Sequence, residues 1–208
     1  MRINRNNRRF IYLISPKYIK NNDFYDKLKQ VLSSNKVNFF QLRLKNTSAL
    51  KIIKIGKKIK KITKKNKVKL LINDNPFIAK IVAADGCHIG QKDVDFKTCR
   101  KILGKKKIIG VTCHNSLKLA KNAIKSKASY LAFGAFYQTK TKKTKFHATI
   151  KTLKEVKKLT NIPIVAIGGI NSSNYKKLLL NKANFLAISS YIWHNKNYKP
   201  KEAIELLK

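Results

Sequence analysis

Acidic residues and arginines are scarce in this chain. Of its 208 residues, 48 are lysine or arginine and 9 are aspartate or glutamate, which gives a formal net charge of +39. Such a charge attracts nucleic acids, anionic membranes and phosphorylated metabolites alike. Arginine, which base recognition favours, supplies only 6 of the 48 basic residues, so the sequence disfavours a dedicated nucleic-acid-binding protein. The abundance of lysine, asparagine and isoleucine, whose codons are rich in A and T, favours a compositional origin of the charge.

Cysteines and long apolar runs are scarce as well. Cys87, Cys99 and Cys113 are odd in number and form no CxxC pair, which disfavours a disulfide framework and a structural zinc site. A reducing cytoplasm fits this pattern best. The apolar run at 10–14 follows basic residues but stops before Pro16, too early for a signal peptide or a membrane span. We therefore expect no targeting or transmembrane segment and no membrane partner.

Short apolar runs alternate with longer amphipathic segments along the chain. The clearest helical pattern is 51–65, where isoleucines form one stripe and lysines the opposite face. The apolar runs lack strict polar alternation, which is typical of strands buried on both faces of a parallel sheet. We therefore predict the α/β class and a single (β/α)8 TIM-barrel domain over residues 1–208, with a flavodoxin-like doubly wound sheet as the alternative. The expected strands are 10–14, 38–44, 68–72, 86–89, 108–112, 130–134, 164–168 and 185–189.

Two of the few carboxylates follow neighbouring predicted strands. Asp74 comes just after the third strand, and Asp93 follows the fourth. The ends of parallel strands meet on one face of a barrel, and carboxylate oxygens there suit Mg²⁺, which also prefers substrate phosphates. The alternative is that each carboxylate caps the helix that follows, since Asn75-Pro76 after Asp74 is typical of a helix start.

Other strand ends carry polar groups on the same predicted face. Gln41, Arg43 and Lys45 alternate along the second strand, and three polar groups on one inward face are costly without a ligand. Hydroxyls and a lysine after the sixth strand suit a phosphate, and Gly169 would let one approach backbone N–H groups. Two anionic groups in one pocket indicate a reaction between two phosphorylated small molecules. The remaining strand-end residues are Asn73, Thr112, Thr139, Thr141, Lys142, Ser189 and Ser190.

Two histidines and one long connection have more than one interpretation. His114, after the fifth strand, is either an acid/base residue or a histidine of the following loop. His88 lies within the fourth strand, and we expect a hydrogen-bonded core residue there rather than a catalyst. The polar, lysine-rich segment 138–149 is either a mobile lid over the site or a long connection.

Seven segments resemble, in order, the thiamine-phosphate synthase (thiamine-phosphate pyrophosphorylase) family, which also contains thiazole tautomerases. The resemblance implies a Mg²⁺-dependent transferase that joins hydroxymethylpyrimidine diphosphate to thiazole phosphate. It also implies a dissociative mechanism, in which pyrophosphate leaves before the thiazole nitrogen attacks. The presence of both carboxylates and of Thr-x-Thr-Lys favours the synthase over the tautomerase, whose histidine would correspond to His114. The segments are 41–45, 71–74, 85–93, 109–114, 130–142, 162–171 and 185–192.

The resemblance also implies a role for each strand-end residue. Asp74 and Asp93 would hold Mg²⁺, and Thr112 stands where the family usually has serine. The catalytic residues would be Arg43, Lys45, Thr112 and Lys142. The pyrimidine diphosphate would be bound by Gln41, Arg43, Lys45, Asn73, Thr112 and Lys142. The thiazole phosphate would be bound by Thr139, Thr141, Gly169, Ser189 and Ser190.

Overall fold

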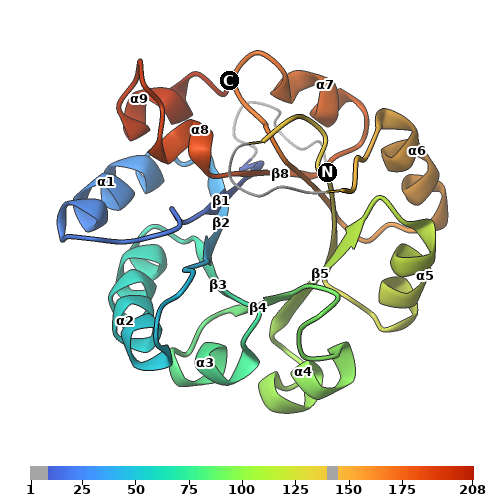
Figure 1. Ribbon diagram of the computed structural model, residues 1–208, viewed down its shortest axis with the longest axis horizontal. Coiled ribbons are helices and arrows are strands. Elements are labelled where there is room, and N and C mark those ends of the chain that lie inside the picture. The colour runs from blue at the N-terminus through green and yellow to red at the C-terminus, as the bar shows by residue number, and fades with distance from the viewer. Residues whose placement is uncertain (1–8, 140–144) are drawn as a thin grey trace.

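Eight parallel strands close into a barrel in chain order in the computed structural model, which describes residues 9–139 and 145–208 (Figure 1). β1 pairs with β2 on one side and with β8 on the other, where Ile11 lies opposite Leu186. This closure confirms the predicted TIM barrel and excludes the doubly wound sheet. The strands are β1 (Ile11–Ile14), β2 (Val37–Leu42), β3 (Lys69–Asn73), β4 (Gly86–Ile89), β5 (Ile108–His114), β6 (Tyr130–Phe133), β7 (Ile164–Ile167) and β8 (Phe185–Ile188).

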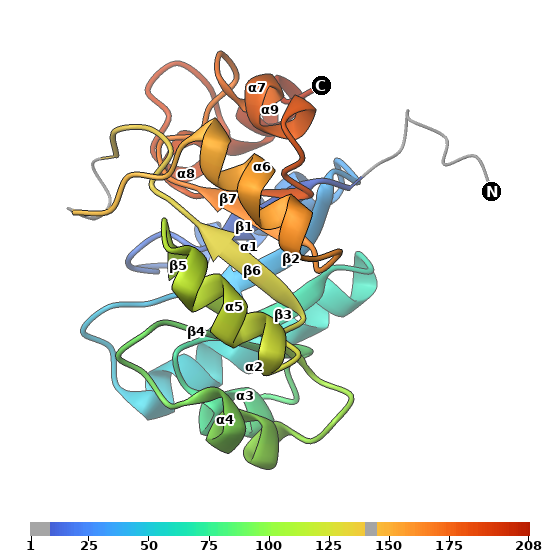
Figure 2. The same cartoon turned by 90° about the vertical axis from the view of Figure 1, so that its right-hand side faces the viewer.

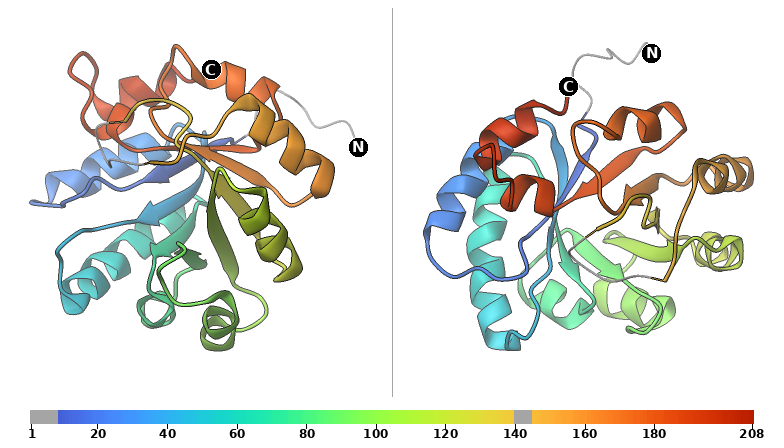
Figure 3. Two further views of the ribbon diagram at one scale, coloured as in Figure 1. Left: turned by 45° about the vertical axis from the view of Figure 1, so that its right-hand side comes forward. Right: turned by 45° about the horizontal axis from the view of Figure 1, so that its top comes forward.

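Helices surround the strands on the outside of the barrel (Figures 1 and 3). Figure 2 shows α5 and α6 lying against the outer side of the neighbouring strands. Across the described ranges, no helix is long and apolar enough to cross a membrane. The helices are α1 (Asp23–Leu32), α2 (Ala49–Lys65), α3 (Pro76–Ile81), α4 (Phe96–Leu103), α5 (Leu117–Lys125), α6 (Ile150–Leu159), α7 (Tyr175–Leu180), α8 (Ser190–Trp193) and α9 (Pro200–Glu205).

Helix α2 confirms the predicted amphipathic segment. It begins after Ser48, whose hydroxyl accepts a hydrogen bond from the Lys51 backbone N–H and so caps the first turn. Ile55 and Ile59 are buried against the barrel, while most of the lysines point outward. The lysine face is thus the solvated side of a barrel helix.

The strands are apolar on both faces because each face meets a different buried cluster. Their outward side chains pack with the helices in one large cluster. Their inward side chains form a second cluster inside the barrel, which includes Tyr12, Phe39 and Tyr130. Gly110 of β5 makes room for one of these rings, since a Cβ built there would lie 1.8 Å from Cζ of Tyr130. The interior is therefore filled with side chains, and ligands can reach only its ends.

Candidate functional site

The carboxyl groups of Asp74 and Asp93 face each other within hydrogen-bonding reach beyond the ends of β3 and β4. Asp74 adopts a left-handed conformation, with φ of 64°, and its N–H donates to the His88 carbonyl over 2.8 Å. Asp93 Oδ2 accepts from the Gly90 N–H over 2.7 Å. These backbone contacts turn the two acidic loops toward each other at one end of the barrel.

The surroundings of Asp74 favour a bound cation. Burial, the hydrogen bond with Asp93 and the Asp93 charge together raise the pKa of Asp74 to about 6, although the charges of Lys45 and Arg43 lower it. Both cations are therefore close enough to act on this carboxylate. A partly buried carboxylate, Asp74, and an exposed one, Asp93, that repel each other suit a hard divalent cation such as Mg²⁺. The described residues contain no group of three histidines, cysteines or acids that would hold a metal unaided, so water and substrate oxygens would complete the coordination.

The structure contradicts the capping alternative for both carboxylates. Helix α3 is capped by Asn75, whose Oδ1 accepts from the Ile78 N–H over 3.0 Å. Helix α4 is capped by Asp95, whose Oδ1 accepts from the Thr98 N–H over 3.1 Å. Neither Asp74 nor Asp93 is the capping residue of these helices, so helix capping accounts for neither carboxylate.

The predicted alternation of Gln41, Arg43 and Lys45 along one strand is wrong in its bounds. β2 ends at Leu42, so only Gln41 belongs to the strand. The chain leaves the sheet there because the Arg43 backbone bonds to the Ser15 side chain. The Arg43 N–H donates to Ser15 Oγ over 2.9 Å, and the Arg43 carbonyl accepts from the Ser15 hydroxyl over 3.1 Å. Arg43 and Lys45 instead reach Asp74 from the loop after β2.

Two amide side chains pair across the barrel end. Gln41, only 3% exposed, donates from Nε2 to Oδ1 of Asn73 at the end of β3. The pair leaves further amide donors and acceptors for a planar polar ligand. The predicted substrate residues on β2 and β3 are thus in contact with each other.

His88 is a hydrogen-bonded residue of the barrel interior, as predicted. Its Nδ1 lies 2.8 Å from Tyr130 Oη, and its Nε2 lies 2.8 Å from Thr112 Oγ1. Burial lowers the pKa of His88 to about 4, so the imidazole is neutral near pH 7. Gln91 also donates from Nε2 to the Thr112 carbonyl. Thr112 is therefore held through both its side chain and its backbone.

Gly168 and Gly169 lie at the end of β7 with φ angles of 107° and 62°. The segment after β6 runs close beside them, and the Tyr137 N–H donates to the Gly168 carbonyl over 3.1 Å. A Cβ at Gly169 would lie 2.4 Å from the Gln138 carbonyl oxygen. Close packing thus accounts for both glycines. Access of a phosphate to their N–H groups stays a prediction.

The other predicted phosphate residues lie at the ends of β8 and β6. Ser189 stands between β8 and α8, and its hydroxyl donates to the Ser15 carbonyl over 3.1 Å. Ser190 begins α8. Thr139 is the last described residue before the gap, whereas Thr141 and Lys142 lie outside the described residues.

His114 stacks on Phe146, with ring centroids 4.1 Å apart and ring planes 20° apart. Phe146 is tied back to the end of β6, because its carbonyl accepts from the Ala135 N–H over 3.0 Å. The described part of the segment predicted to be a lid thus packs against the end of β5. Residues 140–144 of that segment lie outside the described residues.

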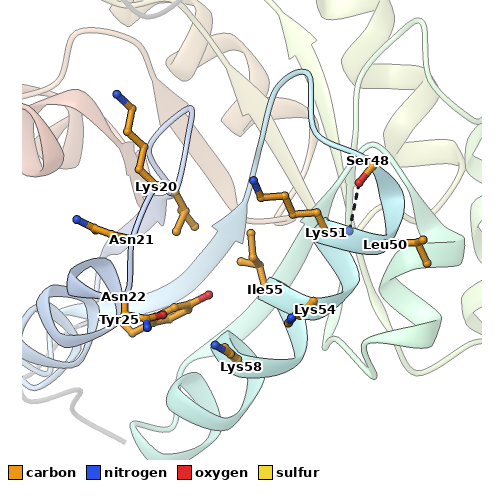
Figure 4. Close-up of a pocket in the computed structure, with 11 residues that line it drawn as sticks. Lys20, Asn21, Asn22, Tyr25, Ser48, Leu50, Lys51, Lys54, Ile55 and Lys58 are labelled. Atoms are coloured by element: carbon orange, nitrogen blue, oxygen red, sulfur yellow. Dashed lines mark hydrogen bonds between the residues drawn. The ribbon is translucent and has the colours of Figure 1, made fainter.

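A shallow groove of about 510 Å³ lies apart from these residues, between α1 and α2 (Figure 4). Its polar lining comes mainly from exposed lysines, and Lys58 lies over the ring of Tyr25 at 5.3 Å. None of the described strand-end residues lines it. The groove belongs to the outer helical wall, so the candidate site is the cluster at the strand ends.

Comparisons of the sequence and of the structure with known proteins find relatives that carry equivalent names. The sequence model of the family described as "Thiamine monophosphate synthase" matches residues 11–192. Thiamine-phosphate synthase of Pelagibacter ubique (strain HTCC1062) is 64% identical over 208 residues, covering 100% of both chains. The Clostridium tetani (strain Massachusetts / E88) enzyme of the same name is 40% identical over 190 residues, covering 91% of this chain and 90% of its own. The solved thiamine phosphate pyrophosphorylase from Pyrococcus furiosus superimposes with a TM-score of 0.84 at 26% identity, covering 97% of this chain and 94% of that one.

Proposed function

Because the chain belongs to the thiamine-phosphate synthase family, we propose that its strand-end cluster joins hydroxymethylpyrimidine diphosphate to thiazole phosphate, forming thiamine phosphate and pyrophosphate. The chain is thus a transferase that acts on small phosphorylated substrates. The observation that carries the assignment to this site is the facing pair Asp74 and Asp93, with Arg43 and Lys45 beside it. Such an arrangement suits a diphosphate better than it suits an unphosphorylated substrate.

The two carboxylates fit Mg²⁺, and Asp74 and Asp93 would hold it. When bound, Mg²⁺ would supply positive charge to the diphosphate oxygens. Arg43 and Lys45 would bind the same diphosphate and stabilise the negative charge that develops as the carbon–oxygen bond breaks. Lys142 is proposed to assist them from the segment after β6. By neutralising the charge of the diphosphate, these groups would let it depart without a nucleophilic side chain.

The remaining residues would hold the two organic groups in line. Gln41 and Asn73 would bind the pyrimidine ring through their paired amides, and Thr112 would contact it from β5. The diphosphate leaves with the electron pair of the carbon–oxygen bond, and the thiazole nitrogen gives its lone pair to the pyrimidine-methyl carbon. The thiazole phosphate would be held by Thr139, Thr141, Gly169, Ser189 and Ser190.

The proposed partners are therefore phosphorylated small molecules. The lysines exposed on α2 form the solvated face of a barrel helix, and we assign them no specific nucleic-acid partner. A membrane partner is likewise not proposed. The three cysteines are free and buried, which suits the reducing cytoplasm where we place the enzyme.

The purified chain is expected to form thiamine phosphate and pyrophosphate in equal amounts from the two substrates, because one bond breaks for each bond formed. Omitting either substrate should abolish both products. The measurement is product analysis by chromatography and mass spectrometry. Because His114 stacks on the Phe146 ring and is given no role in binding either substrate, His114→Ala should retain coupling. Rearrangement of a thiazole substrate without pyrophosphate, lost in His114→Ala, would instead identify a tautomerase.

Mg²⁺ is expected to raise the melting temperature more at about pH 7.5 than at about pH 5, since a protonated carboxyl is a poor metal ligand. The pKa of Asp74 is raised to about 6, so the folded metal-free chain keeps this proton more tightly than the unfolded chain. The contribution of Asp74 to the free energy of unfolding therefore falls as the pH rises through the interval between the ordinary value and about 6. Thermal melts with and without Mg²⁺ measure this, and Asp74→Asn is the control. An equal effect of Mg²⁺ in that variant would contradict the assignment.

A further inference from the structure

Four side chains from four different strands form a line of hydrogen bonds through the barrel. Tyr12 Oη of β1 lies 2.8 Å from Tyr130 Oη of β6, which lies 2.8 Å from Nδ1 of His88 on β4. His88 Nε2 lies 2.8 Å from Oγ1 of Thr112 on β5. The line begins at a tyrosine that is 1% exposed and ends at the partly buried Thr112, which borders the candidate site.

Each buried hydroxyl hydrogen needs an acceptor, and this requirement allows only one direction of donation along the line of hydrogen bonds. Both tyrosine hydroxyls keep their protons, because burial raises the pKa of Tyr12 and that of Tyr130. Within the described part of the chain, Tyr12 Oη has no hydrogen-bond partner besides Tyr130, so Tyr12 must donate to Tyr130. Tyr130 must then donate to Nδ1 of His88. A neutral imidazole with an accepting Nδ1 carries its proton on Nε2, which donates to Thr112 Oγ1.

The opposite direction would start at Thr112 and end at Tyr12. Thr112 would donate to His88, His88 to Tyr130, and Tyr130 to Tyr12. The hydroxyl hydrogen of Tyr12 would then be buried with no acceptor among the described residues. Buried donors without acceptors are rare because each forfeits the hydrogen bond that it makes in water. In the favoured direction, Tyr12, Tyr130 and His88 each donate to the next residue of the line. The hydroxyl hydrogen of Thr112 is not used within the line and can point into the candidate site.

We propose that Tyr130 and His88 are positioning residues that fix Thr112 as a hydrogen-bond donor to the substrate. The ligand must therefore present an acceptor to Thr112, such as a pyrimidine ring nitrogen or a phosphate oxygen. The identity of this acceptor rests on the proposed function, whereas the direction of the line does not. Tyr12 sets that direction because, once Tyr12 donates to Tyr130, Nδ1 of His88 is the acceptor left for the Tyr130 hydrogen among the described residues.

The surrounding residues support a fixed geometry. Gly110 lies opposite both His88 and Tyr130 in the sheet, and its missing side chain leaves the space that the Tyr130 ring fills. The rings of His88 and Tyr130 are stacked, with planes 10° apart and centroids 5.6 Å apart. Thr112 is also held at its carbonyl by Gln91. The donor is thus preorganised before a ligand arrives.

The tautomer of His88 provides a test that needs no catalytic activity. Long-range proton–nitrogen NMR spectra of the ¹⁵N-histidine-labelled chain near pH 7 distinguish a protonated ring nitrogen from a bare one. The expected result is a protonated Nε2 and a bare Nδ1 for His88, assigned by comparison with His88→Gln. A proton on Nδ1 would overturn the proposal even if the chain proves to be an active synthase.

The kinetic test removes one oxygen atom from the line. Tyr130→Phe frees Nδ1 of His88, so Thr112 is no longer held as a donor, and KM for the pyrimidine diphosphate should rise about tenfold. KM for the thiazole phosphate should stay unchanged. The matched control is Tyr175→Phe, which removes the hydroxyl of another tyrosine that is 1% exposed, where it donates to the Lys208 carbonyl away from the line. Equal changes in both variants, or equal changes for both substrates, would indicate a merely structural role and overturn the proposal.

A pair of variants at the end of the line isolates the donor itself. Thr112→Ser keeps a hydroxyl and should keep KM for the pyrimidine diphosphate within about threefold. Thr112→Val has nearly the same shape without the hydroxyl, so this KM should rise at least as much as in Tyr130→Phe. Retention of normal KM in Thr112→Val would overturn the proposal. A chain that proves inactive as a synthase would leave the NMR result to decide the direction of the line.

Discussion

Replacement of Asp93 by alanine is expected to lower Mg²⁺-dependent pyrophosphate release at least about a hundredfold. The change removes one of the two facing carboxylates, so the remaining Asp74 would hold the cation alone beside Arg43 and Lys45. Initial rates measured with both substrates over a range of Mg²⁺ concentrations would show whether the loss lies in metal affinity or in the maximal rate. We expect a loss in both, because the cation would be held weakly and in a less fixed position.

Asp95→Ala is the matched control for this variant. It removes the same charge from the same loop, but Asp95 caps helix α4 by accepting from the Thr98 N–H over 3.1 Å. Its loss should lower the free energy of unfolding modestly while leaving pyrophosphate release near that of the unmodified chain. Similar activity losses in Asp93→Ala and Asp95→Ala would mean that the loss reflects the general negative charge of this loop. The assignment of Asp93 to the cation would then be wrong.

Gly110→Ala is expected to lower the free energy of unfolding by about 3 kcal/mol, at the upper end of what overpacking usually costs. The added Cβ would lie 1.8 Å from Cζ and 2.3 Å from Oη of Tyr130, so the ring must leave its place. Tyr130 is 1% exposed inside the closed barrel, which leaves little room for that movement. Denaturant unfolding monitored by circular dichroism measures the change.

A double-mutant cycle ties this cost to Tyr130. Tyr130→Ala removes the ring that the new Cβ meets, so Gly110→Ala should cost far less in that background than in the unmodified chain. Gly56→Ala in α2 is the control, since a Cβ there comes no closer than 3.0 Å to the Val82 side chain. Its effect should be much smaller. If Gly110→Ala lowers the free energy of unfolding by the same amount with and without Tyr130→Ala, the described packing is contradicted.

The barrel could be predicted from the sequence because its strands are buried on both faces. Each predicted strand overlaps an observed one, since most apolar runs meet the helices on one side and the interior cluster on the other, and β4 meets the interior through His88. The strand ends were less predictable. β2 stops at Leu42 because the Arg43 backbone bonds to Ser15, a contact between residues far apart in sequence that no local pattern reveals.

The candidate site was predictable only in part. Asp74, Asp93, Arg43 and Lys45 come together because strand ends of a barrel share one face, and that inference needs no knowledge of side-chain packing. The hydrogen-bonded line was missed. Tyr130, for example, lies in an apolar run and looks like ordinary core, and the relevant signal is Gly110 in the neighbouring strand.

The glycines after β7 show the opposite difficulty. The sequence predicts a phosphate cradle at Gly169, yet the segment after β6 lies so close to both glycines that packing alone requires them. A glycine pair at a strand end thus has two physical causes that the sequence does not separate. The role of Gly169 in phosphate binding stays a prediction, as do the substrate roles of the other strand-end residues.

The most direct test of this account is the Mg²⁺ dependence of pyrophosphate release by the unmodified chain. Both substrates would be supplied, divalent cations removed by a chelator, and Mg²⁺ then restored in excess. Release should stop without the cation and return when Mg²⁺ is added. Undiminished release in the absence of divalent cations would contradict the claim that Asp74 and Asp93 serve the reaction by holding Mg²⁺.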